Sequence, residues 1–335
     1  MVSKTNNTFL LVKGFLEKGN LPHLLFYGPQ GCGKTSLAHT ICTLIHKDIK
    51  NSNILELNAS DDRGIDITRS RIKIFAESTF HDFFNKHRES PDTNPVNSAK
   101  SANIVVHDDL KKLKFVMLDE CDYMTATAQT ALRRILEVYS ANVRFILICN
   151  NISKINIPVR SRCCNFRFRP ISTNQIKHCI SRVIEKKRLN VEEGAMDLLV
   201  ELCNKDLRFL INSLQQCGLH AAGQVTKSDV CEYFNYVDSA LLPDIIRHIC
   251  SLSLREATEY LSQLSDKMKF DIKNFIHVLH KHLLNQNLDD SIYKNILPKL
   301  AKIQSELYLM PNNKMILFTL AALINSNAEI RAKNT

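Results

Sequence analysis

Short apolar runs alternate with amphipathic stretches over the first half of the chain. Five runs are apolar enough to be buried strands: Leu24–Tyr27, Ile54–Leu57, Phe115–Leu118, Phe145–Cys149 and Phe166–Phe168. Between them, apolar residues recur at helical spacing, as they do from Leu37 to Ile45. Because strands that alternate with helices form parallel sheets, the pattern predicts an α/β core.

The strand signals fade after Pro170, and helical periodicity continues to the end of the chain with a break at Val237–Pro243. We therefore predict a core at residues 1–170, a helical lid at 171–237 and a second helical domain at 238–335. The stretch Ser90–Asn103 is rich in Pro, Asn and Ser and has no period, so we expect an exposed loop inserted into the core.

Composition narrows the class of protein. The 335 residues are 44% hydrophobic and 23% charged, which excludes a disordered or fibrous chain. Lys and Arg outnumber Asp and Glu by 44 to 34, and this net charge of +10 favours polyanionic partners such as nucleic acid. An ordinary basic surface is the alternative. Only nine glycines are present, and three of them lie between Gly28 and Gly33.

The cysteine content and the hydropathy of the chain indicate its cellular compartment. The eleven cysteines form no C-x-x-C pair, so we expect small buried side chains in a reducing compartment and neither disulfides nor a zinc site. No apolar run approaches the length of a membrane span, and Met1–Asn7 lacks the apolar stretch of a signal peptide. We therefore expect an intracellular, soluble protein without membrane partners.

The glycine cluster matches the phosphate-loop pattern G-x-x-x-x-G-K-[ST], with the residues Gly28, Pro29, Gln30, Gly31, Cys32, Gly33, Lys34 and Thr35. It follows a predicted strand and precedes a predicted helix, as the pattern requires. Backbone N–H groups of such a loop surround phosphates, and the helix presents its positive end to them. We expect Lys34 to reach the β- and γ-phosphates of ATP and Thr35 to hold Mg²⁺. An ordinary glycine-containing turn is the alternative.

Two other predicted strands end in polar residues. Asp119 and Glu120 follow Phe115–Leu118, at the sheet edge where open α/β sheets bind ligands. Asp119 suits Mg²⁺, and Glu120 is placed to orient or deprotonate an attacking water. Asn150 follows the next strand and can contact the γ-phosphate or that water. The alternatives are a solvated strand end for the acids and a turn for Asn150.

A proline-anchored turn, Pro158–Cys163, displays Arg160 and Arg162. An arginine presented from outside a phosphate site can stabilise the transition state of a neighbouring molecule's nucleotide in trans. A solvated surface arginine is the alternative reading.

The run Leu55-Glu56-Leu57-Asn58-Ala59-Ser60-Asp61-Asp62-Arg63-Gly64-Ile65-Asp66 resembles the small subunits of replication factor C, the clamp loader. Further motifs of that family occur in order: Leu21 to Gly28, Leu118 to Asp122, Ala128 to Arg134, Ile148 to Asn150 and Ser161 to Cys163. The resemblance covers residues 14–235 and implies an AAA+ ATPase core, a helical lid and, at 238–335, a helical collar that joins five homologous subunits around primed DNA. It implies ATP and Mg²⁺ as cofactors and a nuclear location.

The resemblance also implies roles for single residues. Asn150 becomes the first sensor, Arg162 the finger that acts in trans, and Arg208 the second sensor within Asp206-Leu207-Arg208. Where the family usually shows Gly and a second basic residue around this last motif, Lys205 and Phe209 stand here.

Contacts with primer–template DNA are expected from Arg63, Gln129 and Arg133. Gln129 and Arg133 are four apart, so they share a helix face that lies beside the core-facing positions, and contacts with phosphates carry no sequence preference. An ordinary solvated helix face is the alternative. Ile72 and Phe75 lie in the region that approaches the sliding clamp in the family, although packing in the core explains them equally well.

One family feature is missing from the sequence. Family members carry a longer lead with the motif Trp-Val-Glu-Lys-Tyr-Arg-Pro, which helps to hold adenine, whereas residues 1–27 precede Gly28 here and the chain has no Trp. Either the natural start lies upstream, or nucleotide is held with less support.

The sequence therefore predicts an ATPase subunit of a clamp loader, which uses ATP to open a sliding clamp and place it on primer–template DNA in replication and repair. The alternatives are a ring subunit that does not hydrolyse ATP and another AAA+ motor, such as a DNA helicase or a helicase loader.

Overall fold

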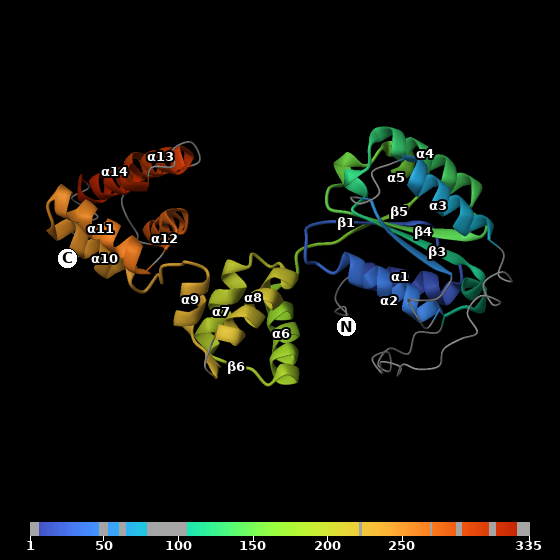
Figure 1. The fold of residues 1–335 in the computed structure, drawn as a ribbon, viewed down its shortest axis with the longest axis horizontal. Helices are drawn as coiled ribbons and strands as arrows, with labels where there is room; N and C mark the ends of the chain where they lie inside the picture. Colours follow the sequence, from blue (N-terminus) through green and yellow to red (C-terminus); the bar gives the residue numbers. More distant parts are fainter. Residues whose placement is uncertain are drawn as a thin grey trace. The chain divides into compact units, whose positions relative to one another are not determined.

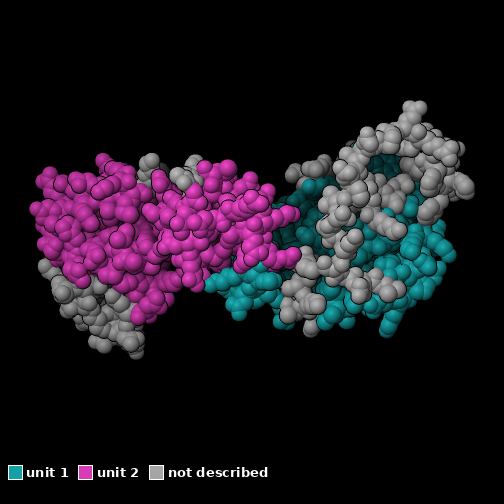
Figure 2. Space-filling view, turned by 90° about the horizontal axis from the view of Figure 1, so that it is seen from below, with its two compact units in different colours: residues 1–178, 203–209 teal, residues 179–202, 210–335 magenta. Residues whose placement is uncertain are grey.

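A computed structural model describes residues 7–46, 53–59, 65–78, 106–220, 223–268, 270–285, 290–307 and 313–326. The chain divides into two units, shown in teal and magenta in Figure 2. Unit 1 comprises Met1–His178 and Cys203–Phe209, and unit 2 comprises Cys179–Leu202 and Leu210–Thr335. The predicted loop Ser90–Asn103 lies outside the described residues.

A five-stranded parallel sheet forms the centre of unit 1, in the order β2-β3-β4-β1-β5. Its strands are β1 (Leu24–Tyr27), β2 (Ile54–Asn58), β3 (Lys114–Asp119), β4 (Val143–Cys149) and β5 (Cys164–Arg167). The α/β core predicted from the apolar runs is thus confirmed. The last strand begins at Cys164 rather than at Phe166.

Helices cover both faces of this sheet (Figure 1). On one face lie α1 (Asn7–Lys18) and α2 (Lys34–His46), and on the other lie α3 (Ile65–Glu77), α4 (Ala126–Val138) and the short α5 (Ile157–Arg160). Alternate residues of β3 enter the two cores: Phe115 and Met117 pack with α1 and α2, while Val116 and Leu118 pack with α4. Burial on both faces explains why the strands read as continuous apolar runs.

The parallel arrangement brings three strand ends together. Tyr27 at the end of β1 is opposite Cys149 at the end of β4, and Leu118 of β3 is opposite Leu147 of β4. The loop after β1, the acids at the end of β3 and Asn150 after β4 therefore meet at one edge of the sheet. This is the edge at which open α/β sheets bind ligands.

The described residues of unit 2 are helical apart from two short parallel strands, β6 (Asn190–Val191) and β7 (Gln224–Val225). Two helices cross the division between the units: α6 (Thr173–Lys187) and α8 (Leu207–His220). The others are α7 (Glu193–Leu202), α9 (Lys227–Tyr233), α10 (Leu242–Ser251), α11 (Leu254–Met268), α12 (Ile272–Asn285), α13 (Asp290–Leu307) and α14 (Asn313–Ser326). The predicted lid (171–237) and collar (238–335) both fall largely in unit 2, so their boundary stays a prediction.

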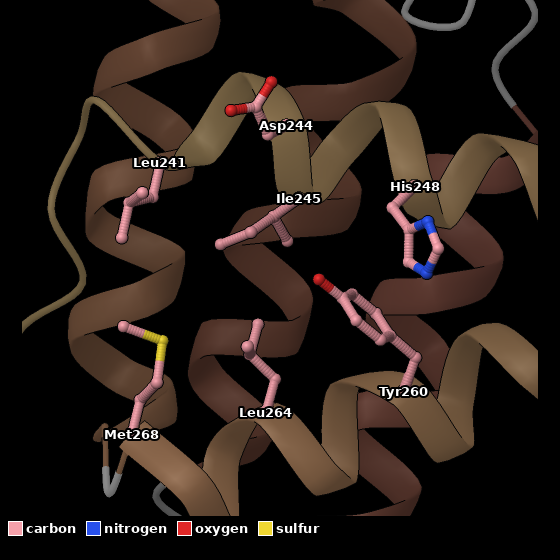
Figure 3. Close-up of a pocket in the computed structure, with 7 residues that line it drawn as sticks. All are labelled: Leu241, Asp244, Ile245, His248, Tyr260, Leu264 and Met268. Atoms are coloured by element: carbon pink, nitrogen blue, oxygen red, sulfur yellow. The ribbon is translucent and has the colours of Figure 1, made fainter.

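A depression of about 420 Å³ opens between α10 and α11 in unit 2 (Figure 3). Its walls are mostly apolar, and the rings of His248 and Tyr260 pack edge to face on one side with centroids 4.5 Å apart. Within the ranges that the structure describes, no helix has both the length and the apolar character needed to span a membrane.

The eleven cysteines are free thiols, and most of them are buried. Burial raises the pKa of Cys42 and that of Cys163 to about 12. Both thiols therefore stay protonated at neutral pH and pack as small apolar side chains, as the sequence predicts.

Candidate functional site

The loop between β1 and α2 is held in a conformation that only glycine adopts without strain at three of its positions. Gly28 has φ of 146°, Gly31 has φ of 65° and Gly33 has φ of 90°. A side chain at Gly28 would collide with the carbonyl oxygen of Phe168, and one at Gly31 would collide with the carboxylate of Asp206. Within the loop, the Cys32 thiol donates a hydrogen bond to the Pro29 carbonyl at 2.8 Å. The fold thus explains the glycines of the motif by geometry.

Lys34 begins α2 and folds back over this loop. Its side chain is only 7% exposed, and its ammonium donates to the carbonyls of Gly28 at 2.9 Å and Pro29 at 2.7 Å. A third hydrogen bond of 2.9 Å reaches Oδ1 of Asn150. Lys34 and Asn150, 116 residues apart in sequence, therefore meet at the mouth of the loop.

Thr35 and Asp119 form the second part of the site. The Thr35 hydroxyl donates to Oδ2 of Asp119 at 2.9 Å, and Oδ1 of the same carboxylate accepts the backbone N–H of Glu120 at 2.8 Å. Glu120 adopts a left-handed backbone with φ of 56°, which turns the chain sharply after β3. A hydroxyl and a carboxylate in contact beside a phosphate loop are hard oxygen donors of the kind that Mg²⁺ prefers, so the residues present fit that ion.

The arrangement can bind a nucleoside triphosphate. The positive end of α2 and the Lys34 ammonium supply the charge for phosphates. Thr35 and Asp119 supply metal ligands, and Glu120 and Asn150 supply polar groups beside them. Each of these side chains comes from the end of a strand or the start of the following helix.

Comparisons with known proteins give the family. The sequence model described as "ATPase family associated with various cellular activities (AAA)" matches residues 24–171. The "Probable replication factor C subunit 5" of Dictyostelium discoideum is 34% identical, over 91% of this chain and 81% of that protein. The "Replication factor C small subunit" of Archaeoglobus fulgidus is 31% identical over 95% and 91%, and "Replication factor C subunit 5" of Homo sapiens 32% over 93% and 84%.

The chain belongs to the replication factor C small-subunit family. It is therefore an AAA+ ATPase and a component of a hetero-oligomeric clamp loader, rather than another kind of AAA+ motor.

Arg162, the predicted finger of this replication factor C subunit, lies outside the cluster around Lys34. Its guanidinium forms an ion pair with Glu137 of α4 and donates to the Pro158 carbonyl at 2.8 Å. The side chain is 30% exposed. It is therefore partly accessible from outside the molecule, as a residue that acts in trans must be.

Arg208 lies at the start of α8, in the short segment that belongs to unit 1. Oδ1 of Asp206 accepts the backbone N–H groups of Arg208 at 2.9 Å and Phe209 at 3.1 Å, which caps the helix. The same carboxylate lies against Gly31. The cap thus joins the first turn of α8 to the phosphate loop, and the side chain of Arg208 is exposed.

The expected exposure of Gln129 is wrong. Its side chain is only 3% exposed. Its amide donates to the carbonyls of Met124 at 3.3 Å and Lys154 at 3.0 Å, and its carbonyl accepts the N–H of Asn156 at 2.7 Å. Gln129 therefore connects α4 to the loop after β4 and has no free surface for a DNA phosphate.

Of the other two residues expected to contact DNA, only Arg133 lies within the described residues. Arg133 is exposed on α4 and pairs with Glu137 at 3.4 Å. Arg63 lies outside the described residues.

The expected clamp contact also needs correction at Ile72. This residue is 1% exposed and belongs to the core between α3, α4 and the sheet, so packing in the core accounts for it. Phe75 packs against the same core, and its ring centroid lies 5.2 Å from the ammonium of Lys114.

The sequence did not predict the contacts of two residues, Glu137 and Asp206, with predicted site residues. Glu137, which contacts Arg162, is four positions after Arg133, a spacing that predicts only a local pair. Asp206 was predicted only as part of the lid motif. Nothing in the sequence pattern signals its contact with Gly31.

Proposed function

We propose that this chain binds ATP with Mg²⁺ and hydrolyses it as one subunit of a clamp-loader ring that places a sliding clamp on primer–template DNA. The observation that supports the proposal most strongly is the convergence of Lys34, Thr35, Asp119 and Asn150 at one edge of the sheet. No comparable set of contacts would be expected from an ordinary turn.

Each residue at this edge has a role in the proposed reaction. Lys34 binds the β- and γ-phosphates, and Thr35 and Asp119 hold Mg²⁺, which when bound neutralises charge on the phosphates. Glu120 orients the attacking water and accepts its proton at a carboxylate oxygen. Asn150, held by Lys34, orients the terminal phosphate or that water.

Two arginines complete the proposed site. Arg208 approaches the terminal phosphate from the lid, and Arg162 contacts the nucleotide of a neighbouring subunit, where it stabilises the charge of the transition state. This division of labour requires several subunits, and the resemblance implies a hetero-pentamer.

Contacts with DNA are proposed for the exposed Arg133 and for Arg63, through phosphates and without sequence preference. Phe75 remains the proposed residue for contact with the clamp. The resemblance also predicts that the protein is located in the nucleus.

A reconstituted complex tests the proposal. ATP turnover is measured with the clamp and primed DNA added separately and together, with and without Mg²⁺. We expect turnover to require Mg²⁺ and to be highest with clamp and DNA together, because both ligands stabilise the hydrolysing arrangement. Turnover that responds to neither ligand would refute the proposed function.

A further inference from the structure

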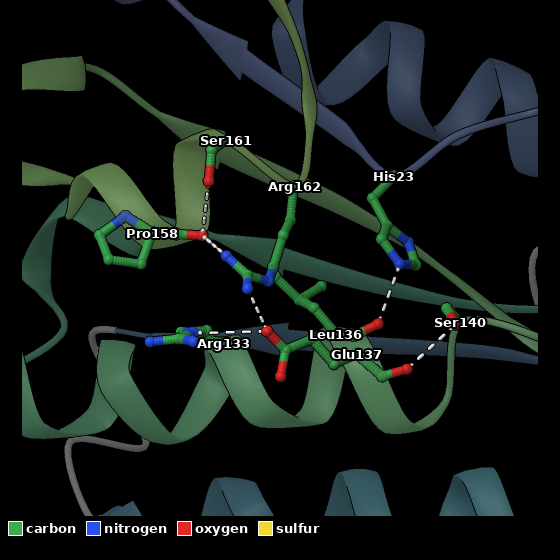
Figure 4. A network of polar contacts seen from close by, with 8 residues as sticks. All are labelled: His23, Arg133, Leu136, Glu137, Ser140, Pro158, Ser161 and Arg162. Carbon is green, nitrogen blue, oxygen red and sulfur yellow. Dashed lines mark hydrogen bonds and ion pairs between the residues drawn. The ribbon is translucent and has the colours of Figure 1, made fainter.

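The guanidinium of Arg162 is fixed by two neighbours from different elements (Figure 4). One terminal nitrogen forms an ion pair with Oε1 of Glu137 on α4, and the other donates to the Pro158 carbonyl of α5 at 2.8 Å. These contacts use two of the five N–H donors that a guanidinium carries. The remaining donors and the exposed third of the side chain are available to an anion from outside.

Glu137 lies on the last turn of α4, beside the turn that carries Arg162. Its Oε1 also accepts from Nε of Arg133 at 3.4 Å. On a helix, an ion pair between positions four apart is more favourable when the acid precedes the base. In the pair of Arg133 and Glu137 the base comes first, so this pair is the weaker kind. We therefore regard Arg162 as the principal partner of Glu137.

The charges in this cluster agree with that assignment. Desolvation alone would raise the pKa of the Glu137 carboxyl, but hydrogen bonds and charge interactions with Arg162 and Arg133 outweigh it and lower the pKa. The carboxylate is thus ionised at neutral pH. Two guanidinium groups share this one carboxylate, so the cluster keeps a net positive charge that attracts a phosphate.

This ion pair is not a source of stability. Side chains in it are 30% and 42% exposed, and exposed pairs of this kind contribute little to folding. It does restrict a long side chain that would otherwise sample many rotamers. When such a side chain binds an anion it loses conformational entropy, which weakens binding. A contact that already orders the side chain reduces this loss and so favours binding.

We propose that Glu137 is a positioning residue, which together with the Pro158 carbonyl holds the Arg162 guanidinium in place for the nucleotide of an adjacent subunit. This inference rests on the proposed function, since it assumes that Arg162 acts in trans. Glu137 does not touch the nucleotide and acts only through Arg162.

Glu137→Ala in the reconstituted complex tests the inference. We expect kcat for ATP to fall roughly 2- to 10-fold, the effect of one rotamer-rich side chain left unordered, while KM stays the same. Glu137→Gln keeps the hydrogen-bond acceptor, so it should restore most of the turnover. Glu259→Ala, which breaks the exposed pair with Arg255 on α11, is the matched control and should leave turnover unchanged.

A second variant separates positioning from a general structural effect. In an Arg162→Ala background, Glu137→Ala should cause no further loss, because the two residues act as a unit. Additive losses would show that Glu137 does not act through Arg162. An unchanged or increased kcat in Glu137→Ala alone would also overturn the inference, since an increase would mean that Glu137 restrains Arg162.

The inference and the proposed function fail in different ways. If Arg162→Ala slows turnover while Glu137→Ala does not, positioning by Glu137 is refuted and the trans role of Arg162 stands. If Arg162→Ala itself has no effect, Arg162 does not act in trans. Both the trans role of Arg162 and its positioning by Glu137 are then refuted.

Discussion

Lys34 is the side chain on which the nucleotide site depends most directly. Its ammonium is held by two loop carbonyls and by Asn150, at the position from which a lysine reaches phosphates. We predict that Lys34→Ala lowers the affinity for ATP about 10- to 100-fold, because a hydrogen bond to a charged group contributes about 1.5–3 kcal/mol. Equilibrium binding of a fluorescent ATP analogue measures the change. Lys112→Ala, at an exposed lysine, serves as the control, and equal losses in both variants would contradict the assignment.

His23 links the sheet to α4 and is neutral in the folded protein (Figure 4). Its Nδ1 accepts the N–H of Phe145 at 3.2 Å, so Nε2 carries the proton and donates to the Leu136 carbonyl at 3.2 Å. Burial lowers the pKa of His23 below the ordinary value of 6.5, with a smaller contribution from Arg144 and an opposing one from the Leu136 carbonyl.

This burial makes stability depend on pH. Between the lowered pKa of the folded state and the unfolded pKa near 6.5, the unfolded chain binds more protons. The free energy of unfolding therefore falls as the pH drops below 6.5, by at most about 1.4 kcal/mol per pH unit for one histidine. Urea denaturation from pH 5.5 to 8 measures it. His23→Gln should reduce this slope, and an unchanged slope would show that other groups cause it.

At the scale of elements, the turn between α7 and α8 contains two non-glycine residues with left-handed backbones. Asn204 has φ of 48° and Lys205 has φ of 67°. The family resemblance implies Gly at the position of Lys205, and the φ at this position gives a physical reason to expect it. Lysine in this region of φ is strained, whereas glycine is not.

We predict that Lys205→Gly stabilises the protein. Relief of the left-handed strain outweighs the extra freedom of glycine in the unfolded chain, which leaves a net gain of roughly 0.5–1 kcal/mol. Lys302→Gly, at an exposed position inside α13, is the matched control and should destabilise by about 1 kcal/mol. Chemical denaturation of both variants provides the measurement, and a loss of stability in Lys205→Gly would contradict the explanation.

The elements that the sequence predicts well are those with a strong local pattern. The buried strands and the phosphate loop have such patterns because both faces of the sheet are covered and because the loop needs glycine at Gly28 and Gly31. β6 and β7 have two residues each, too few to show a period. Gln129 was misplaced because its partners, the backbones of Lys154 and Asn156, lie 25 and 27 residues away.

The whole molecule carries ten more basic than acidic residues, and the proposed function uses some of these cations in three kinds of contact. In the proposed function, Lys34 binds the chain's own nucleotide, Arg162 contacts that of a neighbouring subunit, and Arg133 contacts a DNA phosphate. A chain with these proposed roles would work only within an assembly, which agrees with its membership of the replication factor C small-subunit family.

Hydrolysis by this chain is tested most directly by ATP turnover of the reconstituted complex, in the presence of clamp and primed DNA, with Glu120→Gln in this chain alone. The variant keeps the contacts of Lys34 and Thr35 but lacks the carboxylate that accepts a proton from water. We expect normal ATP binding by this chain and a loss of the share of turnover that it contributes. Turnover equal to that of the unmodified complex would contradict hydrolysis by this chain and identify it as a structural member of the ring.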